Sequence, residues 1–169
     1  TVLSSAPEAG VIVGYARTAR IAAQAPSSEP ANEVRTRRLG YYRHMSEGEG
    51  PSIAVVEDVD YPNAIGAYWG EVNTTVHKAL GLAGALTNGV MRDLGDLPDG
   101  FPVIAGSIGP SHAFVHVVDY AAGARVFDLD IAEGDFVHAD RHGALVIPPD
   151  VIADLATAIE TLFRAERFI

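Results

Sequence analysis

An arginine and an aspartate stand side by side, Arg92 and Asp93, shortly after the Asn88-Gly89 pair. The planar guanidinium of an arginine can bind a carboxylate through two hydrogen bonds. An aspartate carboxylate is an oxygen ligand that suits Mg²⁺ or Mn²⁺. Asp96, three residues further on, is a candidate to hold a metal-bound water. Adjacent charges also occur in exposed turns without any chemistry, so the pair alone leaves both interpretations open.

A second group of candidate binding residues precedes this pair in the chain. A helix is expected to begin near Gly70, Glu71 and Val72. Its first N–H groups have no partner inside the helix, and the positive end of its dipole favours a carboxylate or phosphate. Gly70 lets such a ligand approach the backbone closely. Helix amides, an arginine, a carboxylate and a hard cation together would form a receptor for a small α-keto acid.

The histidines offer an alternative metal site. His112 and His116 are expected on one face of a strand, where two imidazoles can converge on a metal. We favour hydrogen-bonded or interfacial roles for both, because the oxygen-ligand site already accounts for a metal. His138 and His142 flank Asp140 near the end of the chain, and the same interpretation applies to them.

Other polar and aromatic residues receive a structural interpretation first. Glu57, Asp58 and Asp60 form an acidic run after an expected strand, and we favour a solvated loop over an active-site rim. His77 lies in the expected helix, packed or solvated. Trp69, beside Gly70, is expected in the core or an interface rather than as a pocket wall.

Short segments rich in Val, Ile and Phe indicate a β-rich chain with few helices. The expected strands are residues 11–21, 52–59, 84–88, 101–106, 113–120, 124–129, 135–140 and 144–148. The fold class is α/β, as a single layered domain with a mixed β-sheet and flanking helices. The length of 169 residues and the 48% hydrophobic content suit one domain over residues 1–169.

Three helical segments complete this prediction. One has an apolar face of Val72, Val76, Ala79, Leu80 and Ala83, and Gly81 stands at its left-handed cap. The last twenty residues predict an amphipathic helix that lies on the sheet through Val151, Leu155, Ile159, Leu162 and Phe163. The polar residues 23–38 are expected to form a mobile connection whose distal part is helical before Tyr41.

Composition excludes several functional classes. Twelve basic and twenty-two acidic residues give a formal charge of -10, which argues against direct nucleic-acid binding. The absence of cysteine removes thiolate chemistry and fits a reducing cytoplasm. No apolar run reaches the length of a membrane span, and the opening TVLSSAPEAG lacks the pattern of a signal peptide. We therefore expect a soluble cytoplasmic protein that binds no membrane.

The stretch WGEVNTTVHKALGLAGALTNGVMRD resembles the signature of the RraA-like family. That family includes class II pyruvate aldolases acting on 4-hydroxy-4-methyl-2-oxoglutarate, regulators that inhibit ribonuclease E, and proteins formerly labelled menaquinone methyltransferases. GYARTARI and EGDFVHADRHGALVIP also resemble family segments, so the similarity runs from about Gly10 to Pro148. Two departures stand out: Glu133 replaces a usual proline, and SIGPSHAFVHVV replaces an Arg-x-Thr-Pro stretch.

The resemblance implies a swivelling β/β/α fold, a homo-trimer or pair of trimers, and active sites at subunit contacts. It implies that Asp93 binds the divalent metal, Mg²⁺ or Mn²⁺, and that Arg92 binds the pyruvyl carboxylate. The amides of Gly70, Glu71 and Val72 would hold that carboxylate, and Asp96 would position water. The implied activity is that of a metal-dependent carbon–carbon lyase, which cleaves such hydroxy-keto acids or oxaloacetate to pyruvate. The N-terminal helical segment that usually precedes the first strand is expected to be missing.

Other functional classes stay open at this point. A non-catalytic regulator that binds a ribonuclease or another basic protein suits the acidic charge. The methyltransferase label is discounted, because no glycine-rich nucleotide fingerprint is present. A structural or sugar-acid-binding domain is the remaining alternative.

Overall fold

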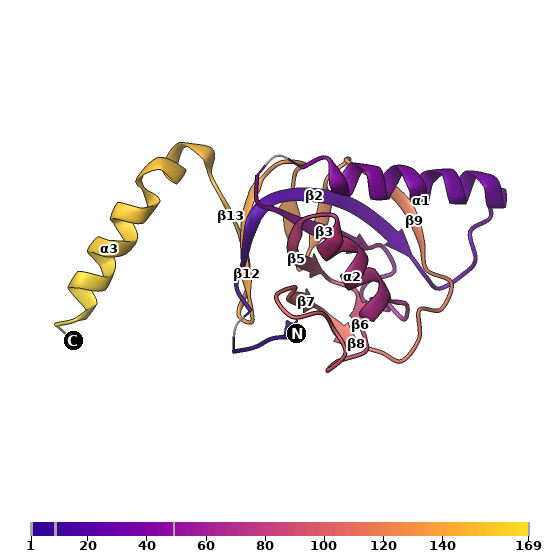
Figure 1. Cartoon of the computed structure of the whole chain (residues 1–169), viewed down its shortest axis with the longest axis horizontal. Helices are drawn as coiled ribbons and strands as arrows, with labels where there is room; N and C mark the ends of the chain where they lie inside the picture. The colour runs from indigo at the N-terminus through magenta and orange to yellow at the C-terminus, as the bar shows by residue number, and fades with distance from the viewer. Residues whose placement is uncertain (1, 9, 49, 169) are drawn as a thin grey trace.

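A curved mixed sheet forms the centre of the computed structural model, which describes residues 2–8, 10–48 and 50–168 (Figure 1). Its strands, in spatial order, are β1 (Leu3–Ser4), β7 (Val103–Ala105), β5 (Leu82–Thr87), β3 (Ser52–Asp58), β2 (Ile12–Ala22), β12 (Phe136–Asp140) and β13 (Gly143–Ile147), with β9 (His116–Tyr120) also paired to β2. The pairs from β2 through β3 and β5 to β7 are parallel, and the others are antiparallel. The predicted α/β class with a mixed sheet is confirmed.

The middle of the sheet is buried on both faces. In β3, Ala54 and Val56 pack with Tyr41 and other residues on one face, whereas Ile53 and Val55 face the opposite cluster. Such continuous burial explains the unbroken apolar run of this strand, which is typical of parallel strands covered on both sides.

Two small sheets flank the large one. The strands β4 (Ala67–Trp69), β6 (Val90–Met91) and β8 (Ser107–Ile108) form a parallel set of three, and β10 (Ala124–Val126) pairs with β11 (Leu129–Ile131). The single strand predicted over residues 124–129 is wrong, because this segment turns in its middle. Phe127 and Asp128 have φ values of 50° and 65°, a left-handed conformation that ends one strand before the next begins.

Helix α1 (Ala31–Ser46) lies along the sheet beside β9 (Figure 1). The expectation of helix in the distal part of residues 23–38 is confirmed, and the helix continues through Tyr41 and Tyr42. Tyr41 and Met45 are buried against the sheet.

Helix α2 (Glu71–Ala79) packs through a different face from the predicted one. Its buried residues are Thr74 and His77, whereas Val72 is 67% exposed. The reason is that both polar side chains find partners: Thr74 donates to Gly70 O at 2.9 Å, and His77 bonds to Tyr41. Gly81 adopts a φ of +91°, so the predicted glycine cap is confirmed.

The C-terminal helix does not lie on the sheet of its own chain, so that prediction is wrong. After β13, a 3-10 helix η1 (Pro149–Asp154) leads to α3 (Leu155–Glu166), which extends away from the body (Figure 1). Pro148 and Pro149 direct the chain away from the sheet at this point. No residue of α3 is buried, and Leu162 and Phe163 expose more than half of their surface. None of the described helices combines the length and apolarity needed to span a membrane.

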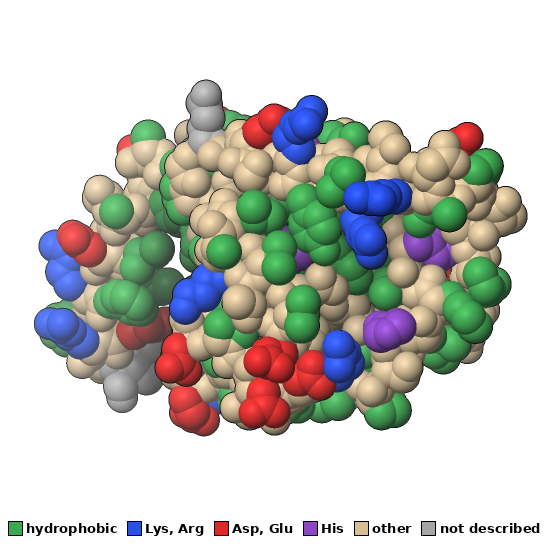
Figure 2. Space-filling model, turned by 45° about the vertical axis from the view of Figure 1, so that its right-hand side comes forward, with side chains coloured by type: hydrophobic (Ala, Val, Ile, Leu, Met, Phe, Trp, Pro, Cys, Tyr) green, Lys and Arg blue, Asp and Glu red, His purple; other side chains and the backbone are tan. Residues whose placement is uncertain are grey.

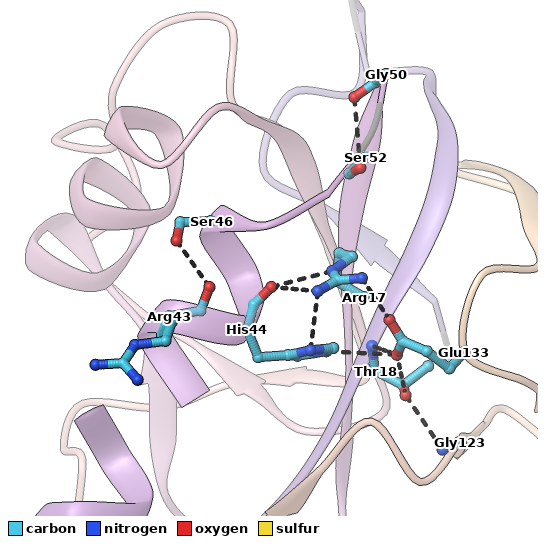
Figure 3. A network of polar contacts seen from close by, with 9 residues as sticks. All are labelled: Arg17, Thr18, Arg43, His44, Ser46, Gly50, Ser52, Gly123 and Glu133. Carbon is cyan, nitrogen blue, oxygen red and sulfur yellow. Dashed lines mark hydrogen bonds and ion pairs between the residues drawn. The ribbon is translucent and has the colours of Figure 1, made fainter. Parts of the chain in front are cut away.

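A polar network fastens the C-terminal end of α1 to the sheet (Figure 3). Glu133, in the loop before β12, pairs with Arg17 Nη1 at 2.9 Å and with His44 Nε2 at 3.4 Å. It also accepts hydrogen bonds from Thr18 N at 2.7 Å and Thr18 Oγ1 at 2.6 Å. Arg17 contacts His44 Nδ1 and donates to the carbonyl of the same residue. The Glu133 carboxylate therefore connects β2, α1 and the loop before β12.

Candidate functional site

The three-stranded sheet brings together the two segments that the sequence singled out. Strand β4 pairs in parallel with β6, with Trp69 opposite Met91. The pairing continues past the strand ends, where Arg92 N donates to Trp69 O at 2.8 Å. Gly70 and the Arg92-Asp93 pair therefore follow neighbouring parallel strands at the same edge. Ligands of open parallel sheets commonly bind at this edge, outside the carboxyl ends of the strands.

The Asp93 carboxylate lies against the N-terminus of α2. Glu71 N donates to Asp93 Oδ2 at 3.1 Å. Gly70 makes this approach possible, because a Cβ added there would lie 2.5 Å from Asp93 Oδ2 and 2.9 Å from Arg92 Nε. Asp93 itself has a φ of 58°, a conformation that aspartate tolerates better than most residues. The Asp93 carboxylate therefore occupies the position where the N-terminus of a helix favours an acceptor of negative charge.

Arg92 is only partly satisfied by its neighbour. Its Nη1 lies 3.1 Å from Asp93 Oδ1 and 2.9 Å from Asp93 Oδ2. Its Nε is buried and has no hydrogen-bond partner among the described residues. A buried donor without a partner costs free energy, on the order of 1–3 kcal/mol. Nε is therefore a position at which a bound ligand can accept a hydrogen bond.

The remaining predicted site residues lie at the open side of this arrangement. Asp96 N donates to Asp93 O at 3.0 Å, which places Asp96 in the same turn with its side chain exposed. Glu71 and Val72 are exposed in the first turn of α2. The amides of Val72 and Asn73 have no partner within the helix, as in any first turn. All the predicted site residues are therefore close together in the fold.

Buried aromatic residues pack against the inner face of α2. The rings of Trp69 and His77 lie 4.7 Å apart at a steep angle, and both residues are fully buried. His77 Nδ1 donates to Asn73 O at 2.6 Å, so its Nε2 accepts from Tyr41 OH at 2.5 Å. Burial lowers the pKa of His77 to about 4 and keeps the ring neutral. Trp69 is confirmed as a core residue.

A divalent cation would find one protein carboxylate here, that of Asp93. Within residues 2–8, 10–48 and 50–168, no three His, Asp or Glu side chains converge as ligands of one metal ion. Mg²⁺ is commonly held by one or two carboxylates, with water and substrate oxygens completing the octahedron. The oxygen donor of Asp93 at an open helix N-terminus fits that requirement, and Asp96 could orient a water of the same shell.

The four surface histidines do not form a metal site among the described residues. His112 lies in a loop, and only His116 belongs to β9, so the expectation that one strand carries both is wrong. His142 Nδ1 lies 3.3 Å from Asp140 Oδ2, and His138 is in β12.

The acidic run after β3 is not the solvated loop that the sequence suggested. Asp58 is fully buried at the end of β3, where its N donates to Asn88 Oδ1 at 2.7 Å. Burial raises the pKa of Asp58 to about 6. Asp60 accepts from Ala23 N at 2.6 Å, and Glu57 accepts from Arg125 N at 2.9 Å. The signal available in the sequence was that Asp58 directly continues the apolar run of a central strand.

The fold and this site geometry agree with a family assignment. The family model described as Aldolase/RraA matches residues 2–146, and the chain belongs to the RraA-like family. This family includes both aldolases or decarboxylases and regulators. No match was found among curated proteins.

Solved structures share the fold at low identity. A structure described as that of novel cellulases from microbes associated with the gut ecosystem is 22% identical, with a TM-score of 0.77 over 99% of this chain and 72% of that one. RraAS2 of Streptomyces coelicolor, described as an unusual member of the RNase ES inhibitor RraA family, is 21% identical, with a TM-score of 0.71 over 94% and 76%. A protein described as a 2-dimethylmenaquinone methyltransferase from Geobacillus kaustophilus HTA426 is 19% identical, with a TM-score of 0.62 over 90% and 86%. These likenesses establish the fold alone.

Proposed function

We propose that the protein is a lyase dependent on Mg²⁺ or Mn²⁺ that releases pyruvate from 4-hydroxy-4-methyl-2-oxoglutarate-like acids or from oxaloacetate. The observation that carries this proposal is the Arg92-Asp93 pair at the N-terminus of α2, where the buried Arg92 Nε has no hydrogen-bond partner in the described part of the chain. A single carboxylate, a free guanidinium donor and helix amides suit an α-keto acid together with a hard cation.

Substrate binding would use the donors that the fold leaves free. The substrate's C1 carboxylate would accept from Arg92 Nε and from the amides of Val72 and Asn73 in the first turn of α2. Glu71 N stays with Asp93, to which it donates in the structure. Gly70 keeps the backbone open to this approach, because any side chain there would meet Arg92 and Asp93.

The reaction breaks the bond between C3 and C4 of the substrate. Asp93 would hold the cation, which when bound supplies Lewis-acid polarisation of the C2 keto oxygen. Arg92 stabilises the charge that develops as the bonding electrons move toward C2. Asp96 would orient the water that removes the C4 hydroxyl proton, and C3 then takes up a proton. Both fragments are pyruvate, and loss of CO₂ from oxaloacetate passes through the same enolate.

We also propose assembly as a homo-trimer or a pair of trimers, with the sites at subunit contacts. The exposed first turn of α2 and the exposed apolar residues of α3 support this proposal. Sedimentation velocity at micromolar concentration should give a species of three or six subunits, and a monomer there would contradict the assembly.

A coupled assay with lactate dehydrogenase tests the activity. Wild-type protein with Mg²⁺ or Mn²⁺ should release pyruvate from these acids well above the rate of metal and buffer, and chelation should abolish the excess. Asp99→Asn is the matched control, because Asp99 is an exposed carboxylate of the same loop outside the site. No excess over metal and buffer across the panel of acids would refute the lyase.

A non-catalytic regulator is the second candidate. The similarity to RraAS2 of Streptomyces coelicolor, described as an unusual member of the RNase ES inhibitor RraA family, and the formal charge of -10 favour it. An acidic surface attracts a basic partner and speeds its association. This candidate requires no turnover and tight binding to a basic protein, and Asp93→Asn should leave that binding unchanged.

A further inference from the structure

A surface cavity lies between the N-terminal half of α1 and the loop that leads into β9. Its volume is about 410 Å³. The lining comprises Pro26, Ser27, Glu29, Ala31, Val34, Arg35, Arg38, His112, Ala113, Phe114, Val115 and His116. Small-molecule sites usually enclose about 300–1,000 Å³, so the space is large enough for a small ligand. None of these residues belongs to the Gly70 and Arg92-Asp93 site.

The cavity is locally basic in an acidic protein. Arg35, Arg38, His112 and His116 line it, and its one carboxylate is Glu29. That carboxylate is already paired, since both of its oxygens accept from the Arg37 guanidinium. The Arg37 hydrogen bonds hold the pKa of Glu29 below its usual value. Glu29 therefore leaves the charges of Arg35 and Arg38 unbalanced.

The two arginines of the cavity are available to bind a ligand. Among the residues that the structure describes, no hydrogen bond or ion pair engages the guanidinium of Arg35 or Arg38. His112 Nδ1 donates to Ala113 O at 2.7 Å and His116 Nδ1 to Phe114 O at 2.9 Å. Both rings are thus held by the backbone, and Nε2 of each ring is left as a hydrogen-bond acceptor in this tautomer.

Apolar side chains form the rest of the wall. Phe114 is 56% exposed although it is a large aromatic residue, and Val34, Val115 and Pro26 stand near it. Figure 2 shows Lys or Arg and His side chains among hydrophobic ones on the right-hand part of the molecule. An aromatic wall beside guanidinium groups suits a ligand with an apolar body and an anionic end.

We propose that this cavity binds a small organic anion, a carboxylate or phosphate group on an apolar body. Arg35 and Arg38 hold the anionic group, Phe114 covers the apolar body, and the histidines contact polar atoms of the ligand. The lining residues His112 to His116 belong to the segment SIGPSHAFVHVV, and the others belong to residues 26–38. The cavity is therefore built from two segments that both lie outside the Arg-Asp motif.

Calorimetric titration of the full chain with phenyl phosphate, benzoate, inorganic phosphate and phenol tests the proposal. Phenyl phosphate or benzoate should bind at least about tenfold more tightly than inorganic phosphate and phenol, because only they offer both a charge and an apolar body. Whichever binds more tightly identifies the anionic group. No binding of either at millimolar concentration overturns the proposal.

Variants locate the binding. The double variant Arg35→Gln/Arg38→Gln should weaken the binding of phenyl phosphate and benzoate at least about tenfold. Phe114→Ser should bring their affinities down to that of inorganic phosphate, which has no apolar body. Arg43→Gln is the control, since Arg43 is an exposed arginine of the same helix outside the cavity. An equal loss in Arg43→Gln would show attraction by overall charge and overturn the site, as would wild-type affinity in the double variant. Asp93→Asn should bind these probes normally, so failure of the lyase proposal leaves this result unaffected.

Discussion

Two charged clusters of the molecule have the same components and differ in what they leave unpaired. The network of Arg17, His44 and Glu133 and the pair of Arg92 and Asp93 each join an arginine to a carboxylate. In each, the carboxylate also accepts from a backbone amide, that of Thr18 in the first and of Glu71 in the second.

The difference lies in the arginine. Arg17 directs its Nε, Nη1 and Nη2 to His44 and Glu133, so every nitrogen has a protein partner. Arg92 uses Nη1 on Asp93, and its buried Nε, beside Gly70, has no hydrogen-bond partner among the residues that the structure describes. An arginine whose nitrogens all contact protein groups stabilises the fold, whereas a buried arginine donor without a partner favours a ligand that can accept its hydrogen bond. Both clusters pair an arginine with a carboxylate, so it is the hydrogen bonding of the arginine, not the number of charges, that distinguishes the structural cluster from the candidate site.

The largest expected effect comes from Asp93→Asn, which should lower pyruvate release at least about a hundredfold. The amide loses the anionic ligand for the cation. It can still accept from Glu71 N, because Asn and Asp serve equally well at a helix N-terminus, so the free energy of unfolding should change by less than about 1 kcal/mol. Urea denaturation beside the pyruvate assay checks both parts. A large loss of stability with full activity would reverse the roles of the two clusters.

Glu133→Ala should give the opposite pattern. It removes the carboxylate that pairs with Arg17 and His44 and accepts from Thr18 at a partly buried position, which should lower the free energy of unfolding by roughly 2–4 kcal/mol at pH 7. Pyruvate release per folded molecule should stay the same. Asp130→Ala is the control, because it removes a well-exposed carboxylate from an exposed pair with Arg125 and should leave the urea midpoint unchanged.

The pH dependence of Glu133 follows from its surroundings. Burial acts to raise its pKa, but hydrogen bonds from His44 and Thr18 outweigh burial and hold the pKa below its usual value. Its contribution is therefore present at neutral pH and is lost as the pH falls through the lowered pKa. In urea denaturation, the wild-type protein should lose this contribution to the free energy of unfolding in acid, whereas Glu133→Ala should show no such loss.

Asp58 is a buried carboxylate that, unlike Glu133 and Asp93, is not paired with an arginine among the described residues. Its Oδ2 has no partner among the described residues, and burial raises its pKa to about 6. The folded state holds the proton more tightly than the unfolded state, so stability falls as the pH rises from about 4 through about 6. Asp58→Asn should flatten this slope and make the protein more stable by roughly 2 kcal/mol at pH 8. Urea midpoints of both proteins between pH 4 and 8 measure it; parallel curves would show that Asp58 does not titrate in this range.

Sequence patterns predicted most strands because apolar runs such as that of β3 report burial directly. They failed at Phe127, where a left-handed turn occurs without the Gly or Asn that usually signals one. They also failed at α2, because Thr74 and His77 are polar residues that become buried only through specific partners. For α3, amphipathicity indicated an apolar face but could not show what covers it.

The sequence predicted the part of the candidate site that lies within one local motif. Gly70 and Arg92-Asp93 follow neighbouring strands, and the motif predicted their proximity. That Asp93 accepts from the Glu71 amide depends on side-chain geometry that spacing does not specify. The network of Arg17, His44 and Glu133 was not predicted, because Glu133 meets Thr18 across 115 positions of sequence. Binding of metal and substrate by the motif residues stays a prediction.

Arg92→Lys should have the smallest effect of these substitutions, and it tests directly whether Arg92 differs from Arg17 in having a donor left for a ligand. Lysine keeps the positive charge but lacks Nε and the planar fork, so the position next to Gly70 loses its donor. KM for the keto acid should rise about tenfold, which corresponds to about 1.4 kcal/mol. The apparent affinity for Mg²⁺ should change by less than about twofold, since Asp93 is untouched. The equivalent change in the network of Arg17, His44 and Glu133 is Arg17→Lys, which should lower the urea midpoint of unfolding and leave KM unchanged. If Arg92→Lys also lowers the midpoint without raising KM, its guanidinium stabilises the fold, and the carboxylate of the substrate binds elsewhere.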